Sequence, residues 1–135
     1  MTLFASLRSI VALPLGAVVL GLAFACQAVP PAGSSASDKI AFDLSTLDEN
    51  GLYGPPDGKR SLDYEFCIPV GDAYAQAVGA IDPSVQLFPQ SRGRIGCGEG
   101  EVLAIGHTNQ ANYDTILIEL AHLDYIERIQ PVDWE

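Results

Sequence analysis

Basic residues are scarce in this chain. Its 135 residues include seven lysines and arginines against seventeen aspartates and glutamates, which gives a formal net charge of −10. A field of this sign repels nucleic acid and anionic lipid surfaces, so we expect neither to be a partner. The acidic residues are scattered rather than gathered in a tail, which indicates a solvated acidic surface. The length suffices for one domain and not for two.

The N-terminal apolar stretch is too short for a typical membrane-spanning helix. It covers the sixteen residues 10–25, whereas a spanning helix needs about 20. A short segment with one positive charge, Arg8, precedes it, and it ends at Ala23-Phe24-Ala25, the small-x-small pattern that signal peptidases cleave. Residues 1–25 are therefore predicted to be the signal peptide of an exported bacterial protein. An uncleaved membrane anchor is the alternative.

Cysteine is rare, and the first of the three cysteines directly follows the predicted cleavage site. Lipoprotein signals place a cysteine there to receive diacylglycerol, although Ala23 and Phe24 depart from the preferred Leu followed by small residues. An unmodified thiol at this position would be unusual in an exported protein. Residues 27–37 are uncharged and rich in Pro, Ser and Ala, which is typical of a flexible linker. Cys26 is thus a candidate lipid anchor and the only expected membrane attachment, with a tether over residues 26–39.

The other two cysteines, Cys67 and Cys97, are predicted to form a disulfide. An even pair in an oxidising compartment most simply becomes one. In the fold predicted below, a third strand separates the strands that carry them. Two strand spacings of about 9.6 Å exceed the roughly 7 Å between bridged Cα atoms. The loop around Cys97 must therefore curl over that third strand.

Hydrophobic patterning predicts one α+β domain over residues 61–135. Apolar and polar residues alternate over residues 62–68, which predicts a strand with one buried and one open face. Helix, strand, strand, helix and strand follow, at residues 73–81, 85–97, 101–105, 113–123 and 125–132. The second strand is interrupted and combines Val85–Phe88 with Arg94–Cys97. This order is that of the ferredoxin-like βαββαβ sandwich.

Two helices would cover one face of such a sheet and leave the other open. Alternation places Asp63 and Glu65 on the open face. Residues 40–60 are predicted to be an extended arm, whose apolar side chains would pack across that face and cover it.

Candidate chemistry is sparse because no catalytic motif is present. Asp63, Glu65 and Cys67 share the polar side of the first strand, which leaves a small enzyme as an alternative. Cys67, Cys97, His107 and His122 are zinc-ligand types, but they lack close paired spacing such as C-x-x-C, so no metal site is predicted. No cofactor is expected either.

Arg92 and Arg94 stand in a Ser-Arg-Gly-Arg segment that could bind an anion. It is not a P-loop, because no lysine and no helix follow. The favoured interpretation is an exposed approach to a hairpin with solubilising charge, and anion binding is the alternative.

Three segments, Gly51–Gly58, Tyr64–Pro69 and Gly93–Cys97, resemble a family of small, uncharacterised exported bacterial proteins. This resemblance implies a shared domain with two internal cysteines and brings no function with it. The stretch Leu117–Ile129 is similar to the last helix and strand of subtilisin-propeptide-type inhibitors. That resemblance implies a ferredoxin-like domain whose tail, here residues 131–135, enters a protease cleft.

We therefore expect a non-catalytic exported envelope protein or lipoprotein that binds a partner or ligand. A protease inhibitor acting through its C-terminal tail and a small enzyme using the Asp63, Glu65 and Cys67 face are the alternatives.

Overall fold

The computed structural model describes residues 35–134. The predicted signal peptide at residues 1–25, the candidate anchor Cys26 and most of the predicted tether lie outside these residues. Among the described residues, no helix has the length and apolar character needed to cross a bilayer.

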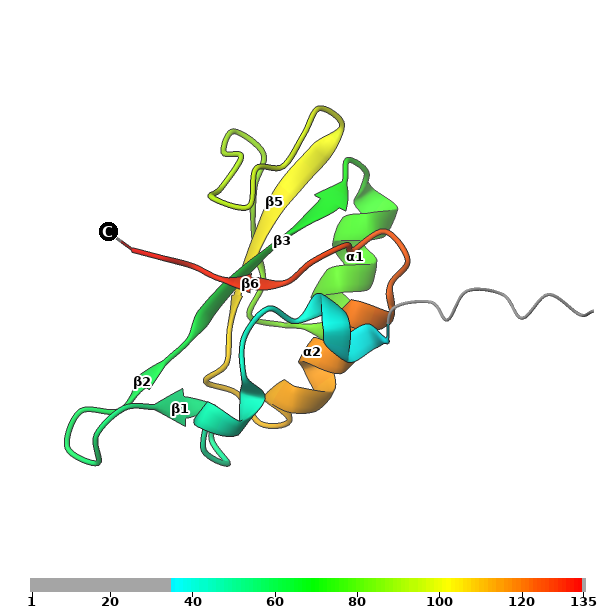
Figure 1. The fold of residues 1–135 in the computed structure, drawn as a ribbon. Coiled ribbons are helices and arrows are strands. Elements are labelled where there is room, and N and C mark those ends of the chain that lie inside the picture. The colour runs from blue at the N-terminus through cyan, green and yellow to red at the C-terminus, as the bar shows by residue number, and fades with distance from the viewer. Residues whose placement is uncertain (1–34, 135) are drawn as a thin grey trace, which may run out of the picture. The chain divides into compact units, whose positions relative to one another are not determined.

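The domain contains a four-stranded antiparallel sheet (Figure 1). Its strands, in spatial order, are β4 (Gln86–Phe88), β5 (Glu101–His107), β3 (Asp63–Pro69) and β6 (Gln130–Pro131). A separate hairpin pairs β1 (Leu52–Tyr53) with β2 (Arg60–Ser61). The predicted buried face of the first strand is borne out, since Tyr64, Phe66 and Ile68 are buried, but Glu65 of the predicted open face is buried as well.

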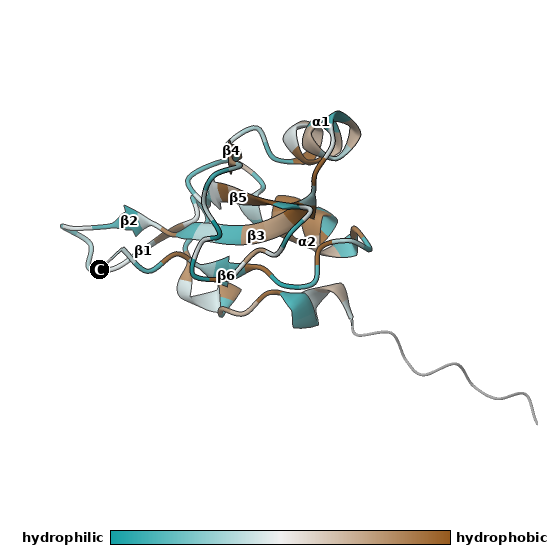
Figure 2. Cartoon of the chain, turned by 90° about the horizontal axis from the view of Figure 1, so that it is seen from above, coloured by the Kyte–Doolittle hydropathy of each residue, from teal (hydrophilic) through white to brown (hydrophobic). Residues whose placement is uncertain are grey.

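Both helices pack against the same side of this sheet. Helix α1 (Asp72–Ile81) ends before Asp82, which is extended because Pro83 disfavours a helical conformation in the residue before it. Helix α2 is Tyr113–His122. One buried cluster joins β3 to both helices through Tyr64, Phe66, Ile68, Val78, Leu117 and Leu120. Hydrophobic segments of β3, β5 and α2 accordingly adjoin at the centre of the domain (Figure 2). The α+β class, with two helices and antiparallel sheets, is confirmed.

The arm before the sheet packs on the helix-covered side. Its 3-10 helices are η1 (Ala36–Lys39), which forms the last part of the predicted tether, and η2 (Leu44–Thr46). Ile40 forms a parallel bridge with Ile129, and the Phe42 ring stacks on Tyr64 with centroids 6.5 Å apart. The arm is thus ordered and packed, but its predicted place across the open face is wrong.

A loop covers part of the open face instead. Arg94–Cys97 was predicted to continue the second strand, and this is wrong: the segment is a turn within the long connection between β4 and β5. In this connection, Gly93 and Gly96 have φ angles of 63° and 80°, a left-handed conformation that favours glycine and interrupts a strand. The predicted last strand at 125–132 is likewise reduced to Gln130–Pro131.

Candidate functional site

A groove lies on the sheet face that the helices leave open, and we call it the open-face groove. Its floor is formed by Glu65 of β3 and by Leu103 and Ile105 of β5. The register pairs Glu65 directly with Ile105, so these side chains stand next to each other on the same face. Residues 91–94 form one wall and residues 132–134 the other. The volume of about 440 Å³ lies within the 300–1,000 Å³ that is typical of ligand pockets.

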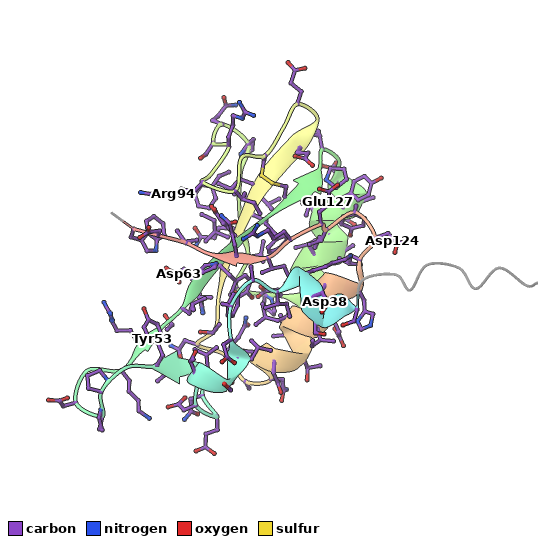
Figure 3. The ribbon with its side chains drawn as sticks, viewed as in Figure 1. Asp38, Tyr53, Asp63, Arg94, Asp124 and Glu127 are labelled. Atoms are coloured by element: carbon purple, nitrogen blue, oxygen red, sulfur yellow. A yellow bond between two sulfur atoms is a disulfide. The ribbon has the colours of Figure 1, made fainter. Side chains whose placement is uncertain are left out.

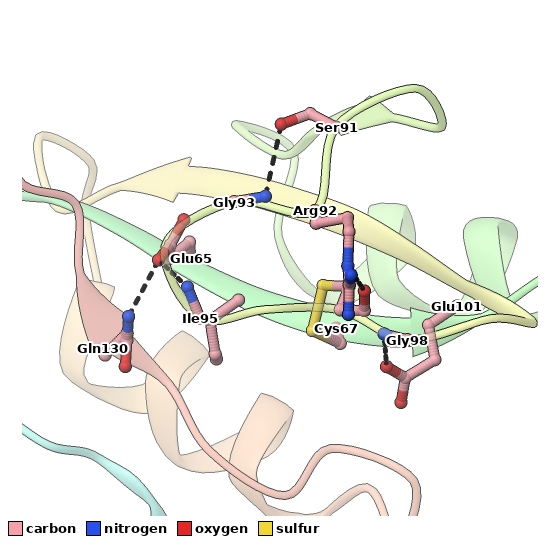
Figure 4. Close-up of a disulfide and its surroundings, with 10 residues drawn as sticks. Glu65, Cys67, Ser91, Arg92, Gly93, Ile95, Gly98, Glu101 and Gln130 are labelled. Carbon is pink, nitrogen blue, oxygen red and sulfur yellow. Dashed lines mark hydrogen bonds between the residues drawn. A yellow bond between two sulfur atoms is a disulfide. The ribbon is translucent and has the colours of Figure 1, made fainter.

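The disulfide holds the first wall in place (Figure 4). Cys67 and Cys97 are bonded, with Cα atoms 5.5 Å apart, and the loop reaches β3 by passing over Leu103 of β5. The predicted crossing of the third strand therefore takes place. Inside the loop, the Arg92 side chain donates from Nε to the carbonyl oxygen of Cys97 at 2.9 Å. A covalent bond and an internal hydrogen bond thus shape this wall.

Glu65 is the notable group of the floor, because its side chain is charged and almost fully buried. The residue is only 2% exposed. Its Oε1 accepts hydrogen bonds from the Ile95 backbone N–H at 2.7 Å and from Gln130 Nε2 at 2.8 Å (Figure 4). One carboxylate oxygen therefore connects the loop, the central strand and the edge strand β6.

The second wall is the C-terminal segment, which is fixed to β3. The Val132 N–H donates to the Asp63 carbonyl oxygen at 2.8 Å, and the Trp134 indole Nε1 donates to the Asp63 carboxylate at 2.9 Å. The Trp134 side chain nevertheless stays 72% exposed. The segment predicted to act as an inhibitor's tail thus lies along the sheet up to Trp134, where the described residues end.

The predicted anion-binding arginines both stand in the loop wall, and both contact other groups. Arg92 is bound to the Cys97 carbonyl oxygen, as described above. Arg94 Nη1 lies 3.6 Å from an Asp133 carboxylate oxygen across the mouth of the groove. Arg94 and Asp63 stand on opposite sides of the C-terminal segment (Figure 3). The positive charge at the rim is therefore partly balanced by an acidic neighbour.

The three residues of the alternative enzyme site share the open face but make separate contacts. Asp63 accepts the Trp134 indole hydrogen bond, Glu65 binds Ile95 and Gln130, and the Cys67 sulfur is in the disulfide. Cys67 consequently has no thiol to act as a nucleophile in this state.

The candidate zinc ligands do not come together as a set of four. His107 ends β5 opposite Asp63, whereas Cys67 lies near the other end of β3. His122 is exposed at the end of α2. Within residues 35–134, the metal-ligating side chains that do gather are Cys67, Cys97 and Glu101, and the first two are bonded to each other.

A second polar cluster lies in the core, away from the open-face groove. Asp82 is fully buried and accepts hydrogen bonds from the Tyr64 hydroxyl, the Ser84 N–H at 2.9 Å, the Ser84 hydroxyl at 2.7 Å and Gln110 Nε2 at 2.9 Å. Burial first, and then the hydrogen bond and negative charge of Asp82, raise the pKa of Tyr64 far above its usual value. The tyrosine therefore stays a neutral donor at physiological pH. The cluster ties β3 to the end of α1 and to the turn before α2.

Sequence reasoning missed two residues of the open-face groove and its surroundings. The sequence predicts Trp134 only as part of a C-terminal tail, and it predicts no role for Gln130. The single tryptophan of an acidic chain was the available signal for the first, because aromatic side chains are enriched at binding surfaces. No sequence signal pointed to Gln130, since its role depends on strand pairing with Glu65.

Comparison with protein-family models, with curated proteins and with solved structures finds no match to this chain. The resemblances to a small exported family and to propeptide-type inhibitors stay predictions. Any function for this protein has to rest on the geometry of its own residues.

Proposed function

We propose that this chain is a non-catalytic exported protein that binds a segment of an envelope partner, or a ligand, in the open-face groove. The observation that carries the proposal is the construction of the groove. A disulfide-bound loop and a hydrogen-bonded C-terminal segment stand over an apolar floor, and an exposed tryptophan lies at the rim. Exposed aromatic side chains beside an apolar, partly polar hollow are typical of binding sites.

We further propose that the domain has the ferredoxin-like topology. The four sheet strands occur along the chain as strand, helix, strand, strand, helix, strand, and they are ordered β4-β5-β3-β6 in space. The first and third strands of this series are central and the second and fourth are at the edges. This arrangement, with both helices on one side, supports the split βαβ sandwich.

Export and a lipid anchor at Cys26 complete the proposal. The Cys67–Cys97 disulfide is consistent with an oxidising, extracytoplasmic location. We expect cleavage between Ala25 and Cys26 with diacylglycerol on the Cys26 thiol. Intact-mass analysis of the protein purified from bacterial membranes measures both. A mature chain that begins with an unmodified Cys26 would exclude the anchor, and a chain still carrying residues 1–25 would exclude cleavage.

A site-specific photocrosslinker tests the groove as the binding site. With benzoylphenylalanine in place of Trp134, we expect a discrete crosslinked product when living cells of the source bacterium are irradiated. Val70 is the matched control position, because it is 62% exposed and does not line the groove. No product at position 134, or the same products at both positions, would contradict the proposal.

A further inference from the structure

Glu65 has an unbalanced charge at the floor of the open-face groove. Burial of a carboxylate costs several kcal/mol unless hydrogen bonds and an opposite charge compensate it. Two N–H donors supply part of this compensation, and both of them bind Oε1. Across residues 35–134 the ion pairs are Lys59–Asp48 and Arg94–Asp133, and neither includes Glu65. The second oxygen, Oε2, receives no hydrogen bond from these residues.

The loop above this oxygen lacks a side chain at the point of contact. Gly93 lies so close that a Cβ atom added to it would stand 2.6 Å from Glu65 Oε2 and 2.7 Å from a Leu103 methyl group. Its φ of 63° is also a conformation that other residues rarely adopt. Glycine therefore lets the loop backbone lie against the carboxylate with no side chain between them, and Glu65 contributes to the lining of the groove.

From this geometry we infer that the open-face groove selects a cationic group, an ammonium or a guanidinium, which pairs with Glu65. The inference rests on the proposed binding function and specifies its ligand class. The natural source is a lysine or arginine side chain of the protein partner, because its aliphatic stem would contact Leu103 and Ile105 while its head reaches Glu65.

Groups around Glu65 also bear on the choice between a cation and an anion. Arg94 at the rim is 3.6 Å from Asp133, which offsets its charge, whereas Arg92 keeps its charge because its Nε is bound to a neutral carbonyl oxygen, that of Cys97. Asp63 adds a carboxylate beside Trp134. The exposed indole offers a π face to a cation. The chain's net charge of −10 attracts cationic partners over longer range.

Blocked amino acids provide a direct test with the folded domain. N-acetyl-lysine amide and N-acetyl-arginine amide are titrated against ¹⁵N-labelled protein, with N-acetyl-norleucine amide as the neutral analogue of lysine. We expect saturable shifts of the Gly93 and Ile95 N–H signals and of the Trp134 indole signal with the two cations. Binding of norleucine amide as tight as that of lysine amide, or shifts with inorganic phosphate alone, would overturn the inference.

The variant Glu65→Gln removes the charge and keeps an oxygen acceptor for Ile95. It should weaken binding of the cationic probes by roughly ten- to hundredfold, the range for a hydrogen bond to a charged group. Glu127→Gln, an exposed carboxylate outside the groove, should bind like the wild type. Unchanged binding by Glu65→Gln would overturn the inference. If Glu65→Gln does not fold, the lysine–norleucine comparison on the wild type still decides.

The two experiments separate the inference from the proposed function. A crosslink at position 134 together with no cation preference refutes only the choice of ligand. Absence of the crosslink at position 134 refutes binding of a partner in the groove, and then the ligand class loses its basis.

Discussion

Replacing Cys67 and Cys97 together by alanine is expected to lower the free energy of unfolding by about 3 to 4 kcal/mol. The two cysteines are 30 residues apart in sequence, and the chain-entropy model assigns a loop of this size a stabilisation of that order. For a domain whose total stability is expected at about 5 to 15 kcal/mol, this loss is large. Urea denaturation of the variant and the wild type measures it.

Treatment with a reducing agent provides the matched control. Reduction should destabilise the wild type by a similar amount and should leave the double variant unchanged, because the variant has no bond to reduce. Free Cys67 and Cys97 thiols in peptide maps of the purified, non-reduced protein would contradict the prediction. So would a wild type whose urea midpoint does not respond to reduction.

Loss of the disulfide should also disrupt the open-face groove before the rest of the domain. The loop wall is attached to the sheet by this bond and by the hydrogen bond from the Ile95 N–H to Glu65. The helix-covered side has its own buried cluster, which does not depend on the loop. The same covalent bond therefore stabilises the domain and keeps the loop wall of the open-face groove in place.

The elements that sequence predicted well are those determined by local pattern. Strict alternation over residues 62–68 placed Tyr64, Phe66 and Ile68 on the buried face, and helix periodicity placed α1 and α2 to within a few residues. These patterns depend on a residue and its close neighbours along the chain. The α+β class followed from their order.

The parts that sequence did not predict depend on contacts between distant residues. Arg94–Cys97 has apolar and β-prone residues, but the disulfide and two left-handed glycines make it a turn. The arm has apolar anchors that suit either side of the sheet, and the stacking of Phe42 on Tyr64 decides the side. Pairing of β6 with β3 brings Gln130 next to Glu65, although these two residues are 65 positions apart in sequence. Local patterns carry no information about such choices.

The same reason explains why the role of Glu65 was only half predicted. Alternation placed it correctly on the open face, and an open face implies a solvated carboxylate. The loop then covers the face and reduces the exposure of Glu65 to 2%. A residue that sequence assigns to the surface has thus become a buried carboxylate with hydrogen-bond donors but no cationic partner, and buried carboxylates without an opposite charge are rare unless they serve binding or catalysis.

Asp82 is the other buried acid of the described domain. Its removal should also strongly lower the free energy of unfolding. Asp82→Ala is expected to destabilise the protein by about 3 to 5 kcal/mol. The substitution leaves the Tyr64 hydroxyl and the Ser84 N–H and hydroxyl without their acceptor, whereas the Gln110 amide keeps the His107 carbonyl oxygen as an acceptor. A buried donor left unsatisfied costs about 1 to 3 kcal/mol, and water entering the space left by the carboxylate would offset part of the sum.

A control and a double variant separate this cause from a general effect of losing an aspartate. Asp57→Ala, in the exposed turn between β1 and β2, should change stability by less than about 0.5 kcal/mol. Tyr64→Phe with Asp82→Ala should cost less than the sum of the single changes, because the double variant has no tyrosine hydroxyl left without an acceptor. Thermal or urea unfolding measures the stability of the wild type, the control, the two single variants and the double variant. Strict additivity would show that the Tyr64–Asp82 hydrogen bond does not couple β3 to the end of α1. Unlike Glu65, Asp82 does not line the open-face groove, so the cations that bind wild-type protein should also bind Asp82→Ala wherever it remains folded.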